Sequence, residues 1–356
     1  MNPIDLIRSW PLEKWTAEID KVGLLDHLGT AVSVEPAGPG FMNVTLRVRG
    51  NRGTAIVAKQ SPPFCAFFPD IPADTNRILA EAFYFKNVSR NAILERQSPT
   101  ILHVDDDRKI VWMEDLGQCQ DFELIYLHRE FTPEEIGTLL SYLARLHDLD
   151  QEISEVPFNL AMRELNHRYI FELPFTDTPY WSMLDKMTPG FSKVVFDGMA
   201  KKPYSEIALA LGSVYFQDAP TLVHGDFYPR SWVKVGSGNE SKIVVLDSEF
   251  CFFGRAEWDY GVLLAHAMLA GQATATLVSL LAHIDSCICV HAKIERSLIF
   301  RFAAVEVIRR LVYISQLPIS PELEWKTGLL RSCLTLLETA SLKDAQNICY
   351  WDRKQK

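Results

Sequence analysis

The sequence is poor in cysteine, and its cysteines follow no pattern that would tie the chain together. Seven cysteines occur in 356 residues, an odd number, with no CxxC pair and no histidine at a ligand spacing. Neither a disulfide framework nor a structural zinc site is therefore indicated. We expect buried, reduced thiols at Cys65, Cys119, Cys251, Cys287, Cys289, Cys333 and Cys349.

Long hydrophobic runs are also lacking. The most apolar long segment, residues 260–281, contains His266 and many alanine, glycine, glutamine and threonine residues, so a pair of buried helices fits it better than a membrane span. Near the N-terminus, charged residues such as Asp5 and Arg8 interrupt the apolar stretch that a secretory signal needs. We therefore expect a soluble cytoplasmic protein without a membrane partner.

Basic residues are too few for a nucleic-acid groove. Lys and Arg number 36 against 45 Asp and Glu, which gives a net charge of −9 at pH 7, whereas nucleic-acid binders depend on a basic surface that displaces counterions from phosphates. A hydrophobic content of 48% with modest numbers of glycine and proline is typical of a globular chain and excludes low-complexity or collagen-like proteins. At roughly 100 to 200 residues per domain, the length predicts about two domains.

Short apolar and alternating segments predict a small antiparallel sheet in the first third of the chain. The predicted strands are 31–36, 44–48, 54–59, 101–104 and 110–113. The turn GNRG joins the second and third strands as a hairpin. Between the third and fourth strands, residues 75–85 have the spacing of a helix and carry Glu81 beside the apolar stripe.

Three features of this region could bind a nucleotide. Lys59 ends the third strand and Glu81 lies on the next helix; a strand lysine oriented by a helix glutamate is the arrangement of protein kinases, with a solvated lysine as the alternative. The turn around Gly40 and Asn43 could lie over phosphates through its backbone N–H groups, but it has no GxGxxG pattern, and an ordinary hairpin turn is equally consistent. Residues 112–116 could offer adenine an apolar slot and backbone groups, or could be a simple strand end.

The remaining two thirds of the chain are predicted to be mainly helical. A capping box formed by Thr132 and Glu135 begins one predicted helix. Residues 300–314 form another strongly apolar helix, which contains the adjacent pair Arg309 and Arg310. A sheet followed by a run of helices predicts the α+β class.

Two acidic motifs inside the helical part carry the strongest chemical signal. Asp226 occurs in HGDF after an apolar run, and Asp247 and Glu249 follow the strand IVVL. Strands joined by a polar turn would bring these carboxylates to one side, where they could share Mg²⁺ for phosphate chemistry. A turn cap at Asp226 and a strand end at Asp247 are the structural alternative. A dinuclear metal hydrolase is a rival because His224 and Asp226 have HxD spacing, but the sequence has no second histidine cluster.

The order of these motifs resembles the aminoglycoside phosphotransferase and choline kinase superfamily, and most closely its methylthioribose kinase family. The resemblance spans nearly the whole chain and rests on GFMNVTLRV, VAKQSPP, RILAEA, WMEDL, LARLHD, NLAMRELNHRYIFELPF, HGDFYPRSW, LDSEFCFFGRAEWDYG and IRRL. It implies a two-lobed protein kinase-like fold, with an ATP-binding lobe at residues 1–116 and a mainly helical catalytic and substrate-binding lobe at residues 117–356. It also suggests a homodimer.

The resemblance implies roles for the residues of the first lobe. Lys59 would contact the ATP phosphates and Glu81 would hold it in place. Glu114 and Leu116 would offer backbone groups to adenine, while the turn of Gly40 and Asn43 corresponds to the phosphate loop.

It also implies a catalytic aspartate and a metal site in the acidic motifs. Asp226 would accept the proton of the acceptor hydroxyl or orient it, and Asp247 with Glu249 would hold Mg²⁺. Ser231 stands where most of the superfamily has a Mg²⁺-binding asparagine, and the methylthioribose kinases also have serine there.

The expected acceptor site combines a family feature with a departure from the family. Arg309 and Arg310 match a pair that faces the sugar and the transferring phosphate. Adjacent helical residues point about 100° apart, so the two must bracket one point unless one of them pairs with Glu306 instead. The catalytic loop reads FYPRSW where the family typically has LHTGSI, so Tyr228 adds bulk next to the acceptor.

The sequence therefore predicts an ATP- and Mg²⁺-dependent kinase for a hydroxyl group of a small molecule. The preferred acceptor is methylthioribose, phosphorylated at its anomeric hydroxyl to the 1-phosphate, a reaction of methionine salvage. The alternatives are a kinase for another sugar, an amino alcohol or an aminoglycoside. A catalytically inactive kinase-like protein that binds nucleotides or partners is the alternative of another class.

Overall fold

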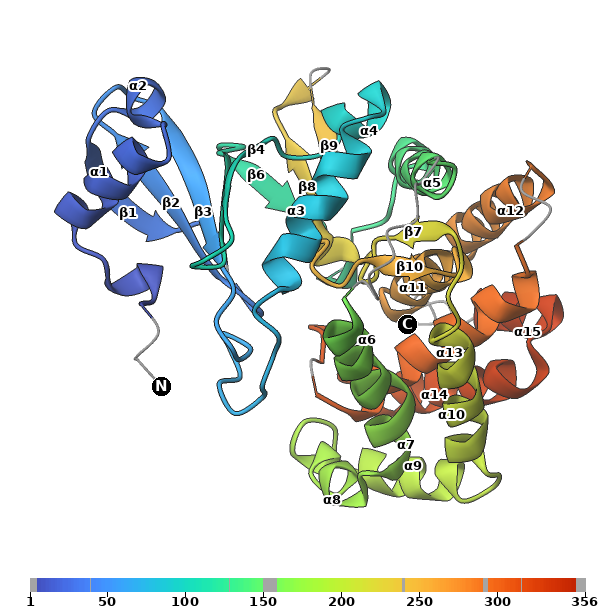
Figure 1. Ribbon diagram of the computed structural model, residues 1–356. Helices are drawn as coiled ribbons and strands as arrows, with labels where there is room; N and C mark the ends of the chain where they lie inside the picture. Colours follow the sequence, from blue (N-terminus) through green and yellow to red (C-terminus); the bar gives the residue numbers. More distant parts are fainter. Residues whose placement is uncertain are drawn as a thin grey trace. The chain divides into compact units, whose positions relative to one another are not determined.

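The chain folds into two compact units (Figure 1). The computed structural model describes residues 5–38, 40–127, 129–149, 159–238, 241–290, 294–314 and 316–349. The first unit comprises Met1–Gln120, Val156–Met162 and Lys234–Cys251, and the second comprises Asp121–Glu155, Arg163–Val233 and Phe252–Lys356. The sequence predicts a single boundary at residue 116, whereas two later segments group with the N-terminal residues in the structure.

A five-stranded antiparallel sheet of order β1-β2-β3-β5-β4 forms the centre of the first unit. Its strands are β1 (Ala31–Pro36), β2 (Val44–Gly50), β3 (Ala55–Gln60), β4 (Ile101–Asp105) and β5 (Ile110–Glu114). The helices of this unit before residue 100 are η1 (Ile7–Ser9), α1 (Leu12–Lys21), α2 (Leu25–Leu28), α3 (Arg77–Val88) and α4 (Ala92–Arg96). The predicted antiparallel sheet and its β2–β3 hairpin are confirmed.

Helices cover the two faces of this sheet. On one face α1 lies beside β1 (Figure 1), and the ring of Trp15 is 5.8 Å from that of Trp112 in β5. On the other face Val57 of β3 packs with Ile78 of α3. Because side chains alternate along a strand, Lys59 shares the face of Val57 and lies on the side of α3. The strand period thus places the predicted lysine next to the helix that carries the predicted glutamate.

Two smaller sheets contain the strands around the acidic motifs. One is an antiparallel pair of β7 and β10, and the other has the order β6-β8-β9. Their strands are β6 (Cys119–Asp121), β7 (Thr221–Val223), β8 (Trp232–Val235), β9 (Lys242–Val245) and β10 (Phe252–Gly254). The predicted neighbours β8 and β9 are confirmed, but β7, which leads to Asp226, and β9, which leads to Asp247, belong to different sheets.

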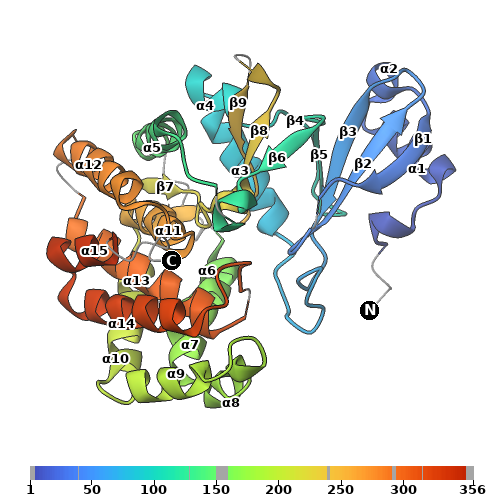
Figure 2. The ribbon, with the colours of Figure 1, turned by 180° about the vertical axis from the view of Figure 1, so that it is seen from behind.

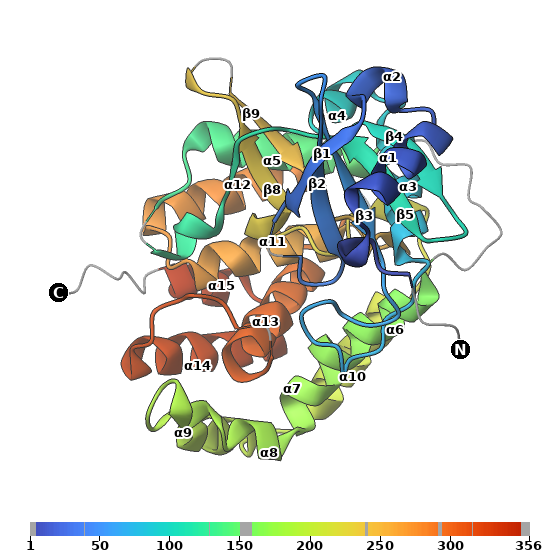
Figure 3. The same ribbon diagram turned by 90° about the vertical axis from the view of Figure 1, so that its left-hand side faces the viewer.

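The second unit is mainly helical. Helix α6 (Leu160–His167) begins among residues of the first unit and ends in the second. The other helices of the second unit are η2 (Glu123–Leu127), α5 (Pro133–His147), the π-helical turn η3 (Arg168–Glu172), α7 (Leu173–Thr176), α8 (Thr178–Trp181), η4 (Leu184–Lys186), α9 (Phe191–Met199), α10 (Tyr204–Tyr215), η5 (Pro229–Ser231), α11 (Glu257–Leu269), α12 (Thr274–Val290), α13 (Arg296–Val312), α14 (Leu323–Thr339) and α15 (Leu342–Cys349). Helix α13 packs against α11 and against α14 (Figure 2), and α9 lies next to α14 (Figure 3).

The predicted helices of this unit are present. Thr132 and Glu135 form a complete capping box at the start of α5. The apolar segment 260–281 forms the end of α11, which is buried along its whole length, and the start of α12. Among the residues that the structure describes, no helix is both long and apolar enough to cross a membrane.

One expectation about the cysteines is wrong. Cys65, Cys251 and Cys333 are buried as expected, but Cys119 is exposed because it lies at the start of the short, largely exposed strand β6. The side chains of Cys287, Cys289 and Cys349 lie outside the described part of the structure.

Candidate active site

Lys59 lies between two carboxylates inside the first unit. Its Nζ donates to Glu81 Oε1 at 2.9 Å and to Asp247 Oδ1 at 2.6 Å. Lys59 and Glu81 are only 4% and 1% exposed. Burial by itself lowers the pKa of Lys59, but Asp247 and Glu81 outweigh it and raise the pKa above its ordinary value. Burial raises the pKa of Glu81, against the effect of Lys59. The structure therefore places two of the predicted site carboxylates around the predicted lysine, which is protonated.

The lysine cluster, which consists of Lys59, Glu81 and Asp247, lines a pocket within the first unit. Glu114 and Leu116, which are predicted to offer backbone groups to adenine, line the same pocket as Lys59, Glu81 and Asp247. Its apolar lining comes from both sheet and loops and includes Ala37, Val57, Met113 and Leu246. An apolar slot that ends in charged groups is the form expected of a site for a base and its phosphates.

Arg47 of β2 fixes the segment 115–117 after β5, a role that sequence analysis missed. Its Nε and Nη2 bind the two carboxylate oxygens of Asp115 at 2.9 and 3.0 Å, and Nη2 also donates to the carbonyl of Gly117 at 3.2 Å. Asp115 Oδ1 in turn accepts from the backbone N–H of Gly117 at 3.0 Å. A bidentate pair of this kind holds the chain that follows β5 in one conformation.

The glycine turn between β1 and β2 is fixed from within. Gly40 has a φ of +51°, and a Cβ there would lie 2.7 Å from the backbone oxygen of Asn43, so only glycine fits. The buried side chain of Asn43 donates to Glu249 Oε2 and accepts from Arg77 Nε at 3.0 Å. Arg77 is fully buried and also donates to the carbonyl of Met42 at 2.8 Å. Because the Asn43 side chain already bonds to Glu249 and Arg77, the turn would bind a phosphate through its backbone N–H groups.

The acidic segment after β9 is held in place by three partners in the first unit. Besides Lys59 on Asp247 and Asn43 on Glu249, Asn159 Nδ2 donates to the backbone oxygens of Glu249 and Cys251 at 2.8 and 2.9 Å. Asp247 has a φ of +57°, which is uncommon for a residue with a side chain. Burial raises the pKa of Glu249, against the effect of Lys59.

Asp226 follows a loop that a buried carboxylate organises in the second unit. Asp259, which is fully buried, accepts from the backbone N–H groups of His224 and Gly225 at 2.8 and 3.0 Å and contacts His147 Nε2 at 2.9 Å. Gly225 has a φ of +86°, which favours glycine. His224 is buried, and its Nδ1 accepts from the backbone N–H of Asp226 at 3.3 Å. His224 thus has a structural partner, which argues against the metal-hydrolase alternative.

The residues after Asp226 include two predicted site residues. Ser231 is buried, and its Oγ donates to the backbone oxygen of Asp226 at 3.1 Å. The ring of Tyr228 lies 5.0 Å from the guanidinium carbon of Arg310, a cation–π contact. The bulky residue that distinguishes this loop therefore packs against one of the two arginines.

Arg309 and Arg310 converge on Asp226. Their Nη2 atoms lie 3.9 and 3.8 Å from Asp226 Oδ1. Both Nε atoms also donate to Glu306, one turn earlier on α13. The two possibilities that the sequence left open, bracketing of one point and pairing with Glu306, are both realised.

His266 contacts Glu306, and the effect of its titration on the stability of the fold can be tested. Burial lowers the pKa of His266 to about 4, from an ordinary 6.5. The unfolded chain therefore binds a proton here at pH values where the folded chain does not, so falling pH between these two values lowers the free energy of unfolding, by at most about 3 kcal/mol from this group. We expect the urea midpoint of His266→Gln to change less between pH 7 and pH 5 than that of the wild type. Equal changes in the two proteins would contradict this prediction.

Among the described residues, no group of three histidine, cysteine, aspartate or glutamate side chains is close enough to hold a metal ion. Asp247 and Glu249 are the two neighbouring carboxylates that could contribute to a site completed by phosphate oxygens. Such a site would take part of its ligands from the nucleotide, whereas other metal sites are formed by protein side chains alone.

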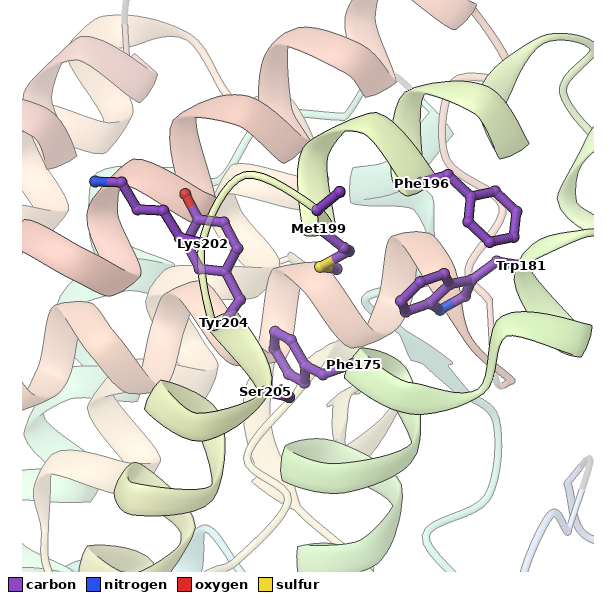
Figure 4. Close-up of a pocket in the computed structure, with 8 residues that line it drawn as sticks. Phe175, Trp181, Phe196, Met199, Lys202, Tyr204 and Ser205 are labelled. Carbon is purple, nitrogen blue, oxygen red and sulfur yellow. The ribbon is translucent and has the colours of Figure 1, made fainter.

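A second cavity, of about 210 Å³, lies in the second unit and contains none of the predicted site residues. Phe175, Trp181 and Met199 point toward one another across it, while the amine of Lys202 points away (Figure 4). It is an imperfectly filled contact between α7, α8, α9 and α10, and Asp226 does not line it.

Sequence analysis missed the residues that hold the site together. Arg77, Asn159 and Asp259 occur in the motifs RILAEA, NLAMREL and EWDYG, but only their burial in the fold reveals their partners. A charged residue inside an apolar helical run, such as Asp259 in α11, is the one available signal, since such residues are rarely buried without a partner.

Comparisons with known proteins agree with the motifs. No protein-family model matches the chain. The methylthioribose kinase of Bacillus velezensis is 24% identical over 264 residues, which are 70% of this chain and 64% of that kinase. The methylthioribose kinase of Yersinia enterocolitica is 23% identical over 252 residues, which are 67% of this chain and 60% of that kinase. The matches thus span less than two thirds of the length of these relatives.

A solved structure has the same fold. The microcompartment-associated aminopropanol kinase superposes with a TM-score of 0.53 and 13% identity, over 93% of this chain and 99% of that chain. This agrees with the expected kinase-like α+β fold. The chain therefore has the fold of a small-molecule kinase, and the resemblance of its sequence to methylthioribose kinases is confirmed.

Proposed function

We propose that this chain is an ATP-dependent kinase that phosphorylates a hydroxyl group of a small sugar, with methylthioribose as the preferred acceptor and its 1-phosphate as the product. The observation that carries the proposal is the contact of Lys59 with Glu81 and Asp247 in a pocket that the segment 113–117 also lines. Kinases use a lysine fixed by a helix glutamate to bind ATP phosphates beside a metal-binding aspartate. The match to methylthioribose kinases supports the choice of acceptor.

Mg²⁺ is the cofactor that fits this site. Asp247 and Glu249 provide carboxylate oxygens, the ligands that Mg²⁺ prefers together with phosphate oxygens. Glu249 is only 5% exposed, and burial raises its pKa, so its ionised form calls for a nearby cation. When bound, Mg²⁺ neutralises charge on the phosphoryl oxygens.

The charges around Asp226 favour a neutral acceptor. Two guanidinium groups lie within 3.9 Å of its carboxylate, so an aminoglycoside or an amino alcohol would bring further positive charge next to them. A sugar hydroxyl can instead donate to Asp226, which would accept its proton or orient it during transfer. Arg309 and Arg310 would stabilise negative charge on the transferring phosphoryl group.

The proposal is tested by nucleotide binding and by turnover. ATP with Mg²⁺, at about 100 times its Kd, should stabilise the protein by about 2.7 kcal/mol and raise its Tm. ADP release should then be measured over a panel of thiosugars, pentoses and amino alcohols, with methylthioribose expected to be fastest. Absence of stabilisation would overturn the kinase proposal. Stabilisation without ADP release from any acceptor would instead favour the inactive nucleotide-binding protein.

A further inference from the structure

Glu306 is a buried carboxylate that the predicted chemistry does not use. It lies on α13, is fully buried, and accepts from both neighbouring arginines, from Arg310 Nε on Oε1 at 2.8 Å and from Arg309 Nε on Oε2. One carboxylate thus holds two guanidinium groups, one with each oxygen. Burial alone would raise the pKa of Glu306, but the two arginines outweigh it and hold the pKa well below its ordinary value.

This double contact explains how two adjacent residues reach one point. Side chains of neighbouring helical residues diverge by about 100°, while residues three and four positions after Glu306 lie over the same turn of the helix. Glu306 binds the inner Nε of Arg309 and of Arg310, so both outer Nη2 atoms extend to Asp226 Oδ1, at 3.9 and 3.8 Å. The contacts with Glu306 therefore favour this convergence.

A second layer holds Glu306. His266 of α11 places Nε2 3.1 Å from Glu306 Oε1, and the hydroxyl of Tyr126 in η2 lies 2.6 Å from His266 Nδ1. Because Glu306 is ionised and can only accept, Nε2 carries the proton of the neutral ring, Nδ1 accepts, and the Tyr126 hydroxyl donates. Both residues are buried. Residues of α13 and α11 therefore contact Glu306 directly, and Tyr126 of η2 holds His266 in place.

The charges of the two arginines and the two carboxylates sum to zero. Arg309 and Arg310 are countered by Glu306 on one side and by Asp226 on the other, and His266 is neutral because burial lowers its pKa to about 4. A buried ion network of this kind contributes little to net stability, whereas it does orient the charged side chains.

We propose that Glu306, held by His266 and Tyr126, is a positioning residue that aims Arg309 and Arg310 at Asp226 and so sets the acceptor end of the active site. This inference rests on the proposed function, since it assigns Asp226 to the acceptor. It extends that function to three residues that the sequence analysis did not place in the site.

The experiment compares Glu306→Gln and Tyr126→Phe with the control Glu257→Gln. Glu257 is also a buried carboxylate, near the start of α11, where it accepts from the backbone N–H of Glu295 at 2.8 Å. Misplaced arginines should lower kcat/KM for the acceptor about 100-fold in Glu306→Gln. Loss of one hydrogen bond in Tyr126→Phe, which removes a single oxygen, should lower it about five-fold. The Kd for ATP with Mg²⁺ should stay unchanged in both, and the control should keep wild-type kinetics.

Two outcomes would overturn the positioning role: wild-type acceptor kinetics in Glu306→Gln and Tyr126→Phe, or equal losses in Glu257→Gln. A readout independent of turnover separates this from failure of the proposed function. In ¹⁵N-labelled protein, Nε–H signals assigned with Arg309→Lys and Arg310→Lys should exchange slowly in the wild type and rapidly in Glu306→Gln. Unchanged exchange contradicts the inference even if no acceptor is found, whereas a wild type that binds no ATP contradicts only the proposed function.

Discussion

Replacing Asp226 by asparagine should lower kcat by about three orders of magnitude. The amide has nearly the shape of the carboxylate, so the backbone contacts of this loop with His224 and Ser231 are kept. What is lost is the group that accepts or orients the proton of the acceptor hydroxyl. The substitution also turns the negative partner of Arg309 and Arg310 into a neutral one. Affinity for ATP with Mg²⁺ should remain within about two-fold of the wild type, because the lysine cluster is unchanged.

Single-turnover ADP formation with the best acceptor measures this effect directly. Asp218→Asn is the matched control, because Asp218 is an exposed aspartate of the same unit that pairs with Arg163 at 2.9 Å. Arg163 is buried, but water screens the exposed carboxylate of Asp218, so the control should keep wild-type turnover. If Asp226→Asn also keeps kcat within a few-fold of the wild type, Asp226 does not serve as the catalytic aspartate.

The parts of the fold that depend on neighbours in the sequence could be predicted from it. The strand period places Lys59 on the face of the sheet that packs against α3, and the helical period places Glu81 on that helix, so their contact follows from two local patterns. The capping box of Thr132 and Glu135 likewise depends on residues three positions apart. Local hydrogen bonds and burial of one face dictate these features, which is why pattern alone identifies them.

The supports of the site could not be predicted because their partners are distant in the sequence. Asn43 and Glu249 are 206 positions apart, and Asn159 and Glu249 are 90 apart. Asp259 closes the loop of His224 from 35 positions away. No periodicity encodes such pairs, because each depends on how separate elements pack. The division of β7 and β9 between two sheets, which the polar turns did not reveal, has the same cause.

Replacing Lys59 by methionine should have the second large effect, on both activity and stability. Loss of a preorganised cation at the phosphates should lower kcat/KM by about 10²- to 10³-fold. Removing one member of a buried ion pair costs about 3–5 kcal/mol, because it leaves Glu81 buried without its cation. Burial already raises the pKa of Glu81, so Glu81 will bind a proton readily in the variant. The folded variant then binds more protons than the unfolded chain, and its loss of stability should shrink as pH falls from 8 to 6.

A double variant separates the two effects. The variant Lys59→Met/Glu81→Gln removes both charges of the buried Lys59–Glu81 pair. Urea unfolding should therefore show that most of the lost stability is regained, while turnover should stay as low as in the single variant. Lys326→Met is the control for loss of a buried lysine, because Lys326 is equally buried but donates to the hydroxyl of Thr188, at 2.9 Å, and should keep full activity. Recovery of turnover together with stability in the double variant would mean that Lys59 only maintains the fold. Stability regained without turnover assigns the lysine to the nucleotide, because the fold then no longer needs its charge and the reaction still does.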